Sequence, residues 1–474
     1  MEYLLLIVPV ILIGILVYRT IQFKPKEKQT IQTTWNIDKK KAYQGLSKLI
    51  QYPTVSYENK DLMDEHAFES LRNHLLESYP NIVKHSTYSL HKKGMLFHLT
   101  GTDDHDPIVL MSHYDVVPAQ EGWKDNPFSG KITNTHIYGR GALDTKSSLN
   151  AIMQSVEYLL ENGHVFKRDL YLAFGGDEET YGDSQIEIVN YLKEQNIKPF
   201  FVLDEGGAIV SNIFPGVQQK TAVIGIAEKG FLNIRLSAKS KGGHASTPPK
   251  ITPIYSLSKA VTRLNNHPAF KLKLTTPVKA LFDKIAPYSK SRVIRFLFAN
   301  LWLFLPLVKW IAKRSGGEFL SLFKTTQAFT MSKGSQAINV IPDVASIDIN
   351  YRLISGETSN DIVKRIKEIV RDPDILVEIM DVSEASTVSK LDERYALVEN
   401  AILSTWKDVI AAPYLMIATS DSRRYHVISE HVYKFSPMDV STKDLEKIHG
   451  FDEDITKENV IQGITFYLNL LSKI

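Results

Sequence analysis

Residues 109–115 read Val-Leu-Met-Ser-His-Tyr-Asp, an apolar run that ends in two side chains able to bind or support a metal ion. The run begins near Pro107 and has the length of one buried strand. Side chains two residues apart on a strand share a face, so His113 and Asp115 would act together. Such a pair also arises by chance in many cores, and its meaning therefore depends on the rest of the chain.

Similar apolar runs occur at residues 169–174 and 200–203, each followed by an acidic, glycine-containing loop. Helical patterns precede them at residues 37–50 and separate them at 145–161 and 184–195. Strands that alternate with helices indicate an α/β fold, a mostly parallel sheet with helices on both faces. Ligands of such sheets collect beyond the carboxyl ends of the strands, and there these loops are expected.

Acids recur in those loops. Asp144 ends Gly-Arg-Gly-Ala-Leu-Asp, Glu178 and Glu179 end Gly-Gly-Asp-Glu-Glu, and Asp204 begins Asp-Glu-Gly-Gly. Alone, Asp144 is most simply a helix N-cap and the glutamates are turn residues. Acids that converge at one sheet edge would repel each other unless cations are present. Two divalent ions would more than balance Asp144, Glu179 and Asp204.

Composition restricts the chemistry further. The 474 residues exceed one ordinary core, which predicts two domains and a leader segment. A net charge of +3, without a basic helix, indicates no nucleic-acid partner. The absence of cysteine excludes disulfides and thiolate catalysis, so a metal must be bound by His, Asp and Glu. Those ligands suit zinc in an open, catalytic site.

The pattern of strand-like and helix-like segments changes near Ala227, and the pattern of the first domain resumes near Val382. Alternating strand-like and helix-like segments between these points predict an inserted α+β domain over residues 227–381. The insert would serve as a lid or dimerisation domain between catalytic parts at residues 37–226 and 382–474. The expected elements of the insert are strands at 231–238, 345–353 and 375–379 and helices at 253–265 and 359–371.

The N-terminus carries an uncharged run from Tyr3 to Tyr18, followed by Arg19 and several lysines. At about 1.5 Å per residue the run spans roughly 24 Å, which favours a single-pass membrane anchor over residues 1–23 and a linker over 24–36. A cleaved signal peptide is the alternative, but Glu2 stands in place of a basic start and no small-residue cleavage site follows. The downstream charges favour a cytoplasmic catalytic domain, although the side of the membrane stays open.

A second apolar stretch, Phe296–Val308, has Asn300 as its single polar residue and is too short to span a bilayer. One interpretation is a buried helix broken at Pro306. The other is an apolar wall for a lipid-like substrate or a contact with a membrane surface.

In their order, these motifs resemble the di-zinc metallopeptidase family of aminoacylase, carboxypeptidase S, acetylornithine deacetylase and succinyl-diaminopimelate desuccinylase. The resemblance runs from about Ala42 to the C-terminus. It implies that Asp144 bridges two zinc ions, with Co²⁺ or Mn²⁺ as alternative metals. The other implied ligands are His113 and Asp204 for one ion, and Glu179 and His449 for the second.

The same resemblance assigns Glu178 as the general base and Asp115 as the carboxylate that orients His113. A di-zinc site lowers the pKa of a bridging water and polarises an amide carbonyl. Glu178 can accept the proton of that water and pass it to the leaving nitrogen.

Three further residues match the family's substrate-binding positions. The resemblance implies that His244, in Lys-Gly-Gly-His-Ala-Ser, donates to the oxyanion, often from a partner subunit. It also implies that Asn339 contacts the substrate and that Arg423 binds a substrate carboxylate. The plain alternatives are a loop histidine, a turn asparagine before proline and a surface arginine. Arg424 adds a second arginine where the family has one basic position.

Within the family the sequence looks closest to carboxypeptidase S and to the hydrolase and synthase of N-fatty-acyl amino acids. The expected activity is cleavage of an amide bond in a substrate with a free carboxylate, by a carboxypeptidase or an N-acyl-amino acid amidohydrolase. The alternatives are a fatty-acyl substrate and, in another class, a membrane-tethered binding protein without activity. The resemblance also implies that a homodimer would form through the inserted domain.

Overall fold

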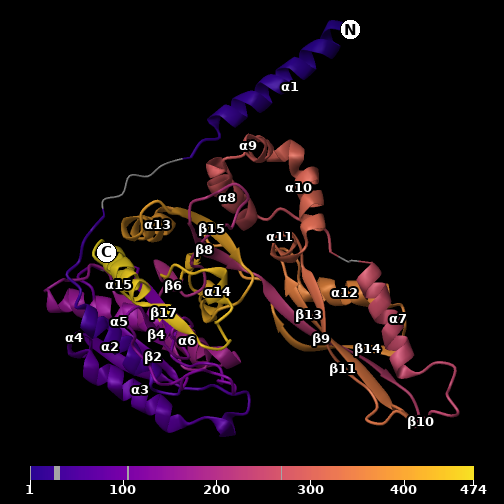
Figure 1. Cartoon of the computed structure of the whole chain (residues 1–474), viewed down its shortest axis with the longest axis horizontal. Helices are drawn as coiled ribbons and strands as arrows, with labels where there is room; N and C mark the ends of the chain where they lie inside the picture. Colours follow the sequence, from indigo (N-terminus) through magenta and orange to yellow (C-terminus); the bar gives the residue numbers. More distant parts are fainter. Residues whose placement is uncertain (1, 26–31, 104–105, 268–269) are drawn as a thin grey trace.

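The computed structural model describes residues 2–25, 32–103, 106–267 and 270–474. Within them the largest unit is a sheet with the strand order β1-β2-β5-β3-β6-β16-β8-β15, in which β7 also pairs with β8 (Figure 1). The strands are β1 (Ser86–His91), β2 (Gly94–Leu99), β3 (Ile108–His113), β5 (Leu170–Gly175), β6 (Phe201–Asp204), β7 (Ile209–Val210), β8 (Thr221–Glu228), β15 (Ile410–Met416) and β16 (Val432–Lys434). The central strands β5, β3, β6 and β16 are parallel, whereas β1 and β2 join antiparallel at one edge.

Helices cover both faces of this sheet, as the sequence predicted. Ile108 and Leu110 of β3 belong to the core under one set of helices, and Val109 and Met111 belong to the core on the opposite face. Burial on both sides explains why the strands read as continuous apolar runs. The first face carries α2 (Lys39–Ile50), α3 (Glu65–Ser78), α4 (Pro80–His85), α5 (Lys146–Glu161), α13 (Glu393–Thr405) and α15 (Lys457–Leu471), and the second carries α6 (Ser184–Glu194).

The inserted domain is built on an antiparallel sheet of order β11-β13-β9-β14. Its elements are β9 (Gly230–Lys239), β11 (Thr326–Lys333), β13 (Val344–Leu353), β14 (Ile375–Ser383), α7 (Pro253–Asn266) and α12 (Ser359–Val370). The two helices pack on one face of the sheet and close a separate core. A short ribbon, β10 (Gly243–His244) with β12 (Val340–Ile341), lies at the end of this sheet far from the catalytic domain (Figure 1).

One part of the predicted insert lies against the catalytic domain instead of the antiparallel sheet. The helices α8 (Thr276–Ile285), α9 (Arg292–Ala299), α10 (Leu301–Ser315) and α11 (Gly317–Ser321) occupy this part. Val278 and Phe282 of α8 share a core with Ile410 and Ala412 of β15. The chain therefore leaves the catalytic domain after β8, crosses back over its edge, and returns to the insert.

The expectation of a buried helix broken at Pro306 is wrong. The break falls at Asn300 between α9 and α10, and Pro306 lies inside α10. The Asn300 side chain donates to the Phe296 carbonyl at 3.0 Å, which satisfies an acceptor at the end of α9 and stabilises the break there. Much of the apolar surface of α10 is exposed rather than buried.

The N-terminal run forms α1 (Glu2–Gln22), with Pro9 inside the helix. Among the described residues no single helix is both long and apolar enough to cross a membrane. The α9–α10 pair reaches the required length and composition together, but it is bent by 118°. The membrane anchor over residues 1–23 therefore stays a prediction. Residues 26–31 of the predicted linker lie outside the described residues.

Candidate metal centre and active site

The topology of the central sheet brings the predicted acidic loops to one edge. His113 is the last residue of β3 and pairs with Gly175 at the end of β5. β6 runs parallel to β3 on its other side and ends at Asp204. The loops after three adjacent parallel strands thus meet beyond their carboxyl ends, the place where such sheets bind ligands.

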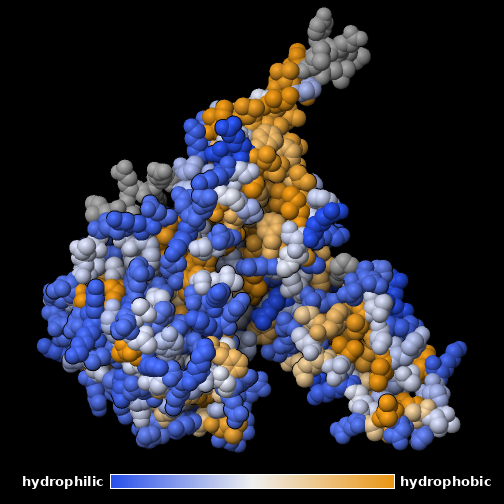
Figure 2. All heavy atoms as spheres, viewed as in Figure 1, coloured by the Kyte–Doolittle hydropathy of each residue, from blue (hydrophilic) through white to orange (hydrophobic). Residues whose placement is uncertain are grey.

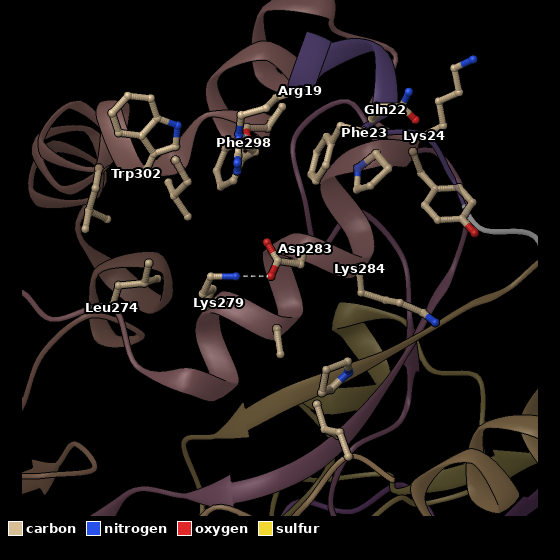
Figure 3. Close-up of a pocket in the computed structure, with 18 of the residues that line it drawn as sticks. Arg19, Gln22, Phe23, Lys24, Leu274, Lys279, Asp283, Lys284, Phe298 and Trp302 are labelled. Carbon is tan, nitrogen blue, oxygen red and sulfur yellow. Dashed lines mark hydrogen bonds and ion pairs between the residues drawn. The ribbon is translucent and has the colours of Figure 1, made fainter. Parts of the chain in front are cut away.

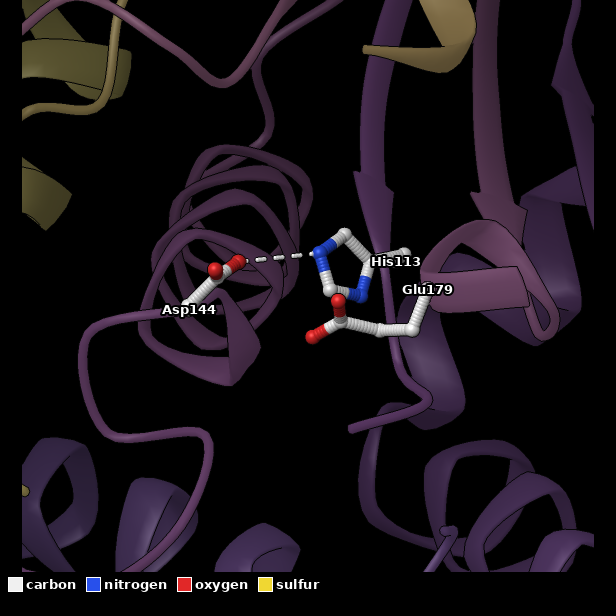
Figure 4. A group of neighbouring side chains, drawn as sticks. All are labelled: His113, Asp144 and Glu179. Carbon is white, nitrogen blue, oxygen red and sulfur yellow. Dashed lines mark hydrogen bonds and ion pairs between the residues drawn. The ribbon is translucent and has the colours of Figure 1, made fainter. Parts of the chain in front are cut away.

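Asp144 lies between the two histidines that were predicted as ligands. Its Oδ1 is 3.0 Å from His113 Nε2, and its Oδ2 is 3.1 Å from His449 Nε2. Glu179 Oε2 lies 3.1 Å from the same nitrogen of His449. One carboxylate with an imidazole at each oxygen is the arrangement expected of a residue shared by two metal ions. Figure 4 shows Asp144 and Glu179 on two sides of the His113 ring.

Two groups of side chains at this edge place their potential ligand atoms within 4.8 Å of one another. One contains His113, Asp144 and Glu179, and the other contains His113, Glu178 and Glu205. Glu205 was not predicted from the sequence, yet its Oε1 lies 3.2 Å from His113 Nε2.

Asp204 was predicted to share a metal ion with His113, but its carboxylate is hydrogen-bonded to a different partner. Its Oδ2 accepts a hydrogen bond from the backbone of Ser422 at 3.1 Å. Asp204 as a metal ligand stays a prediction, and Glu205 becomes a second candidate for the same ion. Neighbouring residues at the end of a strand point to opposite faces, so an Asp-Glu pair does not reveal which acid faces the site.

The electrostatics of this edge favour cations. Burial raises the pKa values of Glu178, Glu179, Asp204 and Glu205, since a charged carboxylate is costly away from water. Hydrogen bonds with Asp144 and Glu179 raise the pKa of His449 to about 10. The crowded carboxylates therefore favour a positive charge at this edge, on the imidazole of His449 or on a bound cation.

Glu179 supplies a second sign that the donor set fits a metal. Its Oε1 is buried and has no hydrogen-bond partner within the described part of the chain. A buried acceptor left without a partner costs about 1–3 kcal/mol, and a bound cation would remove that cost. Carboxylate oxygens and imidazole nitrogens are ligands that divalent zinc, cobalt and manganese accept.

Asp115 is fully buried and connects two of the loops. The backbone carbonyl of Asp115 lies 3.0 Å from His113 Nδ1. Its carboxylate accepts from the backbone N–H groups of Glu178 at 3.2 Å and Glu179 at 3.1 Å, and from Ser56 Oγ at 2.7 Å. The carboxylate Oδ1 of Asp115 is farther from His113 Nδ1, at 3.4 Å, so its role in orienting His113 stays a prediction. The carboxylate does fix the loop that carries both glutamates.

Glu453 is a positioning residue of the candidate site that the sequence analysis did not single out. Its carboxylate accepts from Arg140 Nη1 at 2.9 Å and from the backbone of Leu143 at 2.7 Å and Asp144 at 3.2 Å. Arg140 also donates to the carbonyl of the residue that follows His449, at 2.9 Å. Glu453 therefore holds the loop that presents Asp144 against the segment that presents His449. Its proximity to His449 in the sequence was the available signal.

Arg423 lies in the 3₁₀ segment Asp421–Val427, which follows β15. Its guanidinium carbon is 5.7 Å from the centre of the Tyr181 ring and 5.3 Å from that of Phe231. Nε and Nη1 are buried and lack hydrogen-bond partners among the described residues. The Nε atom of Arg424 is also buried without a hydrogen-bond partner among these residues. Donors left unpaired in this way favour an anionic ligand.

His244 and Asn339 are not brought to this edge. They lie together on the exposed β10–β12 ribbon, where the Ala245 N–H donates to the Asn339 carbonyl at 2.9 Å. His244 Nδ1 is 2.6 Å from Ser246 Oγ. Figure 1 places this ribbon at the far end of the insert, well away from β6 of the catalytic sheet. One chain therefore brings the predicted metal ligands and Glu178 to one edge, whereas His244 and Asn339 lie on a remote surface.

Comparison with known families gives a match over most of the chain. The profile described as "Peptidase family M20/M25/M40" matches residues 109–473, which include the metal-binding edge and the whole insert. The chain belongs to this peptidase family. It is consequently an enzyme of the metallopeptidase type, and family membership gives no support to a binding protein without activity.

Two relatives locate the chain within the M20/M25/M40 family, and one solved structure shares its fold. "Probable carboxypeptidase S-like 2" of Dictyostelium discoideum is 35% identical, covering 97% of this chain and 92% of the relative. "N-fatty-acyl-amino acid synthase/hydrolase PM20D1" of Mus musculus is 33% identical, covering 90% and 86%. The crystal structure of an M20 family metallo-carboxypeptidase, Sso-CP2 from Sulfolobus solfataricus, superposes with a TM-score of 0.65 at 16% identity, covering 91% and 98%. The predicted α/β catalytic domain with an inserted domain is confirmed.

Proposed function

We propose that this enzyme hydrolyses an amide bond in a substrate with a free carboxylate, releasing a C-terminal or an N-acylated amino acid. The observation that carries the proposal is the guanidinium of Arg423, whose Nε and Nη1 are buried without a hydrogen-bond partner among the described residues. It lies beside Tyr181, which directly follows the loop carrying Glu178 and Glu179. A guanidinium can bind both oxygens of a carboxylate at once and so fix the substrate's orientation.

We propose two zinc ions as the cofactor, with cobalt or manganese able to replace them. Asp144 would be shared between the ions. His113 would hold one ion together with Glu205 or Asp204, and Glu179 and His449 would hold the other. When bound, such ions activate a water molecule and polarise the scissile carbonyl.

Glu178 has the position and the environment of a general base. It belongs to the group around His113, and its pKa is raised well above the ordinary glutamate value by burial. A base of raised pKa takes a proton readily from an attacking water near neutral pH. In this proposal Glu178 then gives the proton to the leaving nitrogen, while Arg423 keeps the substrate carboxylate in place.

A homodimer would complete the site. His244 can donate to the oxyanion only after it comes close to Glu178, and within one chain it lies on the remote ribbon. We propose that the ribbon of a partner subunit supplies His244 and Asn339. This explains why both residues are exposed in a single chain.

The proposal is tested with the purified full chain and a panel of dipeptides and N-acyl amino acids. Hydrolysis should stop on chelation and return when zinc is added. Each substrate is paired with its C-terminal amide, which lacks the charge that Arg423 would bind. Turnover that is equal for the acid and the amide would refute the carboxylate site, and activity that survives complete metal removal would refute the metal mechanism.

A second candidate is hydrolysis or synthesis of N-fatty-acyl amino acids. It is supported by the 33% identity to the mouse synthase/hydrolase over 90% of this chain and by the exposed apolar helix α10. The same assay separates the two candidates when N-acetyl and N-oleoyl derivatives of one amino acid are compared. A clear preference for the acetyl compound would rule out the fatty-acyl activity.

A further inference from the structure

From Ile7 to Val17 the helix α1 carries no polar side chain on any face. From Ile7 to Gln22 its only buried residue is Leu16, and the apolar residues around it are exposed, with Val10 at 68% and Ile13 at 59%. A helix that is apolar all round is stable only inside a protein core or in lipid. The part from Ile7 to Gln22 spans about 24 Å, and the rest of the protein buries little of it.

The helix α10 adds an apolar stripe on one side. Its buried residues Leu301, Val308 and Ala312 face the core beneath β15. The opposite side of α10 carries exposed apolar residues in two rows. Within each row the residues are four or eight positions apart, so they lie on the same face of a helix with 3.6 residues per turn. The exposed apolar residues of these rows are Trp302 and Trp310, and Leu303, Leu307 and Ile311.

The two apolar surfaces are joined. The Asn300 side chain donates to the Leu16 carbonyl at 3.2 Å, and Arg19 Nε donates to the Ala299 carbonyl at 3.1 Å. These bonds fix the end of α1 at the corner between α9 and α10. Figure 2 shows apolar atoms running from α1 onto α10 along the same face.

Charge identifies the partner of this surface. From Lys290 to Ser315 the chain carries six basic residues and no acidic one: Lys290, Arg292, Arg295, Lys309, Lys313 and Arg314. Trp310 lies under the Arg314 guanidinium at 4.5 Å. Tryptophan beside basic residues at the border of an apolar surface is typical of the bilayer interface.

The junction of α1 with α9 and α10 also borders a cavity of about 770 Å³. Figure 3 shows Arg19 and Lys24 on one side of it, and Phe298 and Trp302 nearby. Lys279 and Asp283, an ion pair on α8 with half-exposed side chains, also line it. Basic and aromatic side chains therefore surround the point at which the apolar surface meets the body of the protein.

We propose that α1 and the α9–α10 pair form one docking surface for an anionic lipid bilayer, which receives α1 and the exposed stripe of α10. A second copy of the chain is a poorer occupant, because six basic residues would face six others. The inference does not rest on the proposed reaction. It differs from a simple N-terminal anchor in requiring α10 to enter the lipid as well.

The absence of cysteine makes this directly testable. Leu303→Cys, Leu307→Cys and Ile311→Cys each introduce the only thiol, at an exposed position of the stripe, and Leu376→Cys in β14 is the matched control with similar exposure. Each full-length variant is labelled with an environment-sensitive fluorophore and reconstituted into vesicles of phosphatidylcholine with phosphatidylserine. Probes on α10 should shift to the blue and be quenched by spin-labelled lipid, whereas the probe at residue 376 should not respond.

A second variant tests the charge. Lys309→Gln, Lys313→Gln and Arg314→Gln together should weaken insertion of the α10 probe on the order of a hundredfold, because each basic residue near an anionic surface contributes about 1 kcal/mol. An α10 probe that remains in water while the protein is bound to vesicles overturns the proposal, since α1 alone would then hold the protein. A blue shift that appears without lipid and grows with protein concentration overturns it too, because it assigns the face to a second copy.

Discussion

The metal-binding edge of the catalytic sheet and the β10–β12 ribbon of the insert carry the two halves of the predicted active site in opposite ways. At the edge, side chains from separate loops lie within hydrogen-bond distance of each other. On the ribbon, His244 and Asn339 are exposed and have mainly local partners. The edge is therefore assembled by the fold of one chain, whereas the ribbon acts only when something brings it to the edge.

The largest effect is expected at the edge, from Glu178→Gln. Removing a general base costs about 10²–10⁴-fold in rate, and the amide keeps the shape of the side chain. The kcat should fall by about that factor while the metal content, measured by elemental analysis, stays unchanged. Glu187→Gln on the surface of α6 is the control. Near-normal turnover in the Glu178 variant would remove this residue from the mechanism.

The next largest effect is expected on the ribbon, from His244→Ala, and it shows whether His244 acts in the site of a partner subunit. His244→Ala should lower kcat by about 10²–10³-fold, the usual cost of losing one oxyanion donor. Co-expression with the Glu178→Gln chain should restore activity, because mixed dimers contain one site with both residues intact.

The control for this experiment is His66→Ala, which removes another exposed histidine and should leave the rate unchanged. If mixed dimers form but remain inactive, the ribbon must act within its own chain through a movement of the insert. Both halves of the active site would then come from one chain.

A smaller effect distinguishes the two acids at the end of β6. Because Glu205 lies 3.2 Å from His113 while Asp204 is bonded to a backbone N–H, Glu205→Gln should weaken binding of one zinc ion more than Asp204→Asn. A loss of about 10–100-fold in affinity is expected, as for other changes at metal sites. Competition with a chromophoric chelator measures it. The reverse order would return the ligand role to Asp204.

The smallest effect is expected at Arg423, between the two regions. Arg423→Ala should raise KM about 10–100-fold for substrates with a free carboxylate, since a charge-assisted hydrogen bond contributes about 1.5–3 kcal/mol. It should leave the KM of the C-terminal amides almost unchanged. Arg424→Ala provides the comparison within the same segment. An equal change in KM for acid and amide would show that Arg423 does not read the carboxylate.

Much of this architecture could be predicted, because it depends on local pattern. Apolar runs near residues 109, 170 and 201 gave the strands, and the acids after them gave the edge at which they meet. Three kinds of feature could not be read in this way. The choice between Asp204 and Glu205 depends on the exact end of a strand, and the break at Asn300 rather than Pro306 depends on one side-chain hydrogen bond. The role of Glu453 depends on contacts with residues far away in the sequence.

That last feature bears on when the enzyme becomes active during its synthesis. Arg140 and Glu453 are 313 positions apart, and the bonds around Glu453 are what join the Asp144 loop to the His449 segment. Contacts between such distant segments form late in folding, because a long loop must close first. A growing chain can complete much of its sheet and its insert before His449 emerges. Hydrolytic activity would therefore be withheld until the segment that carries His449 has left the ribosome.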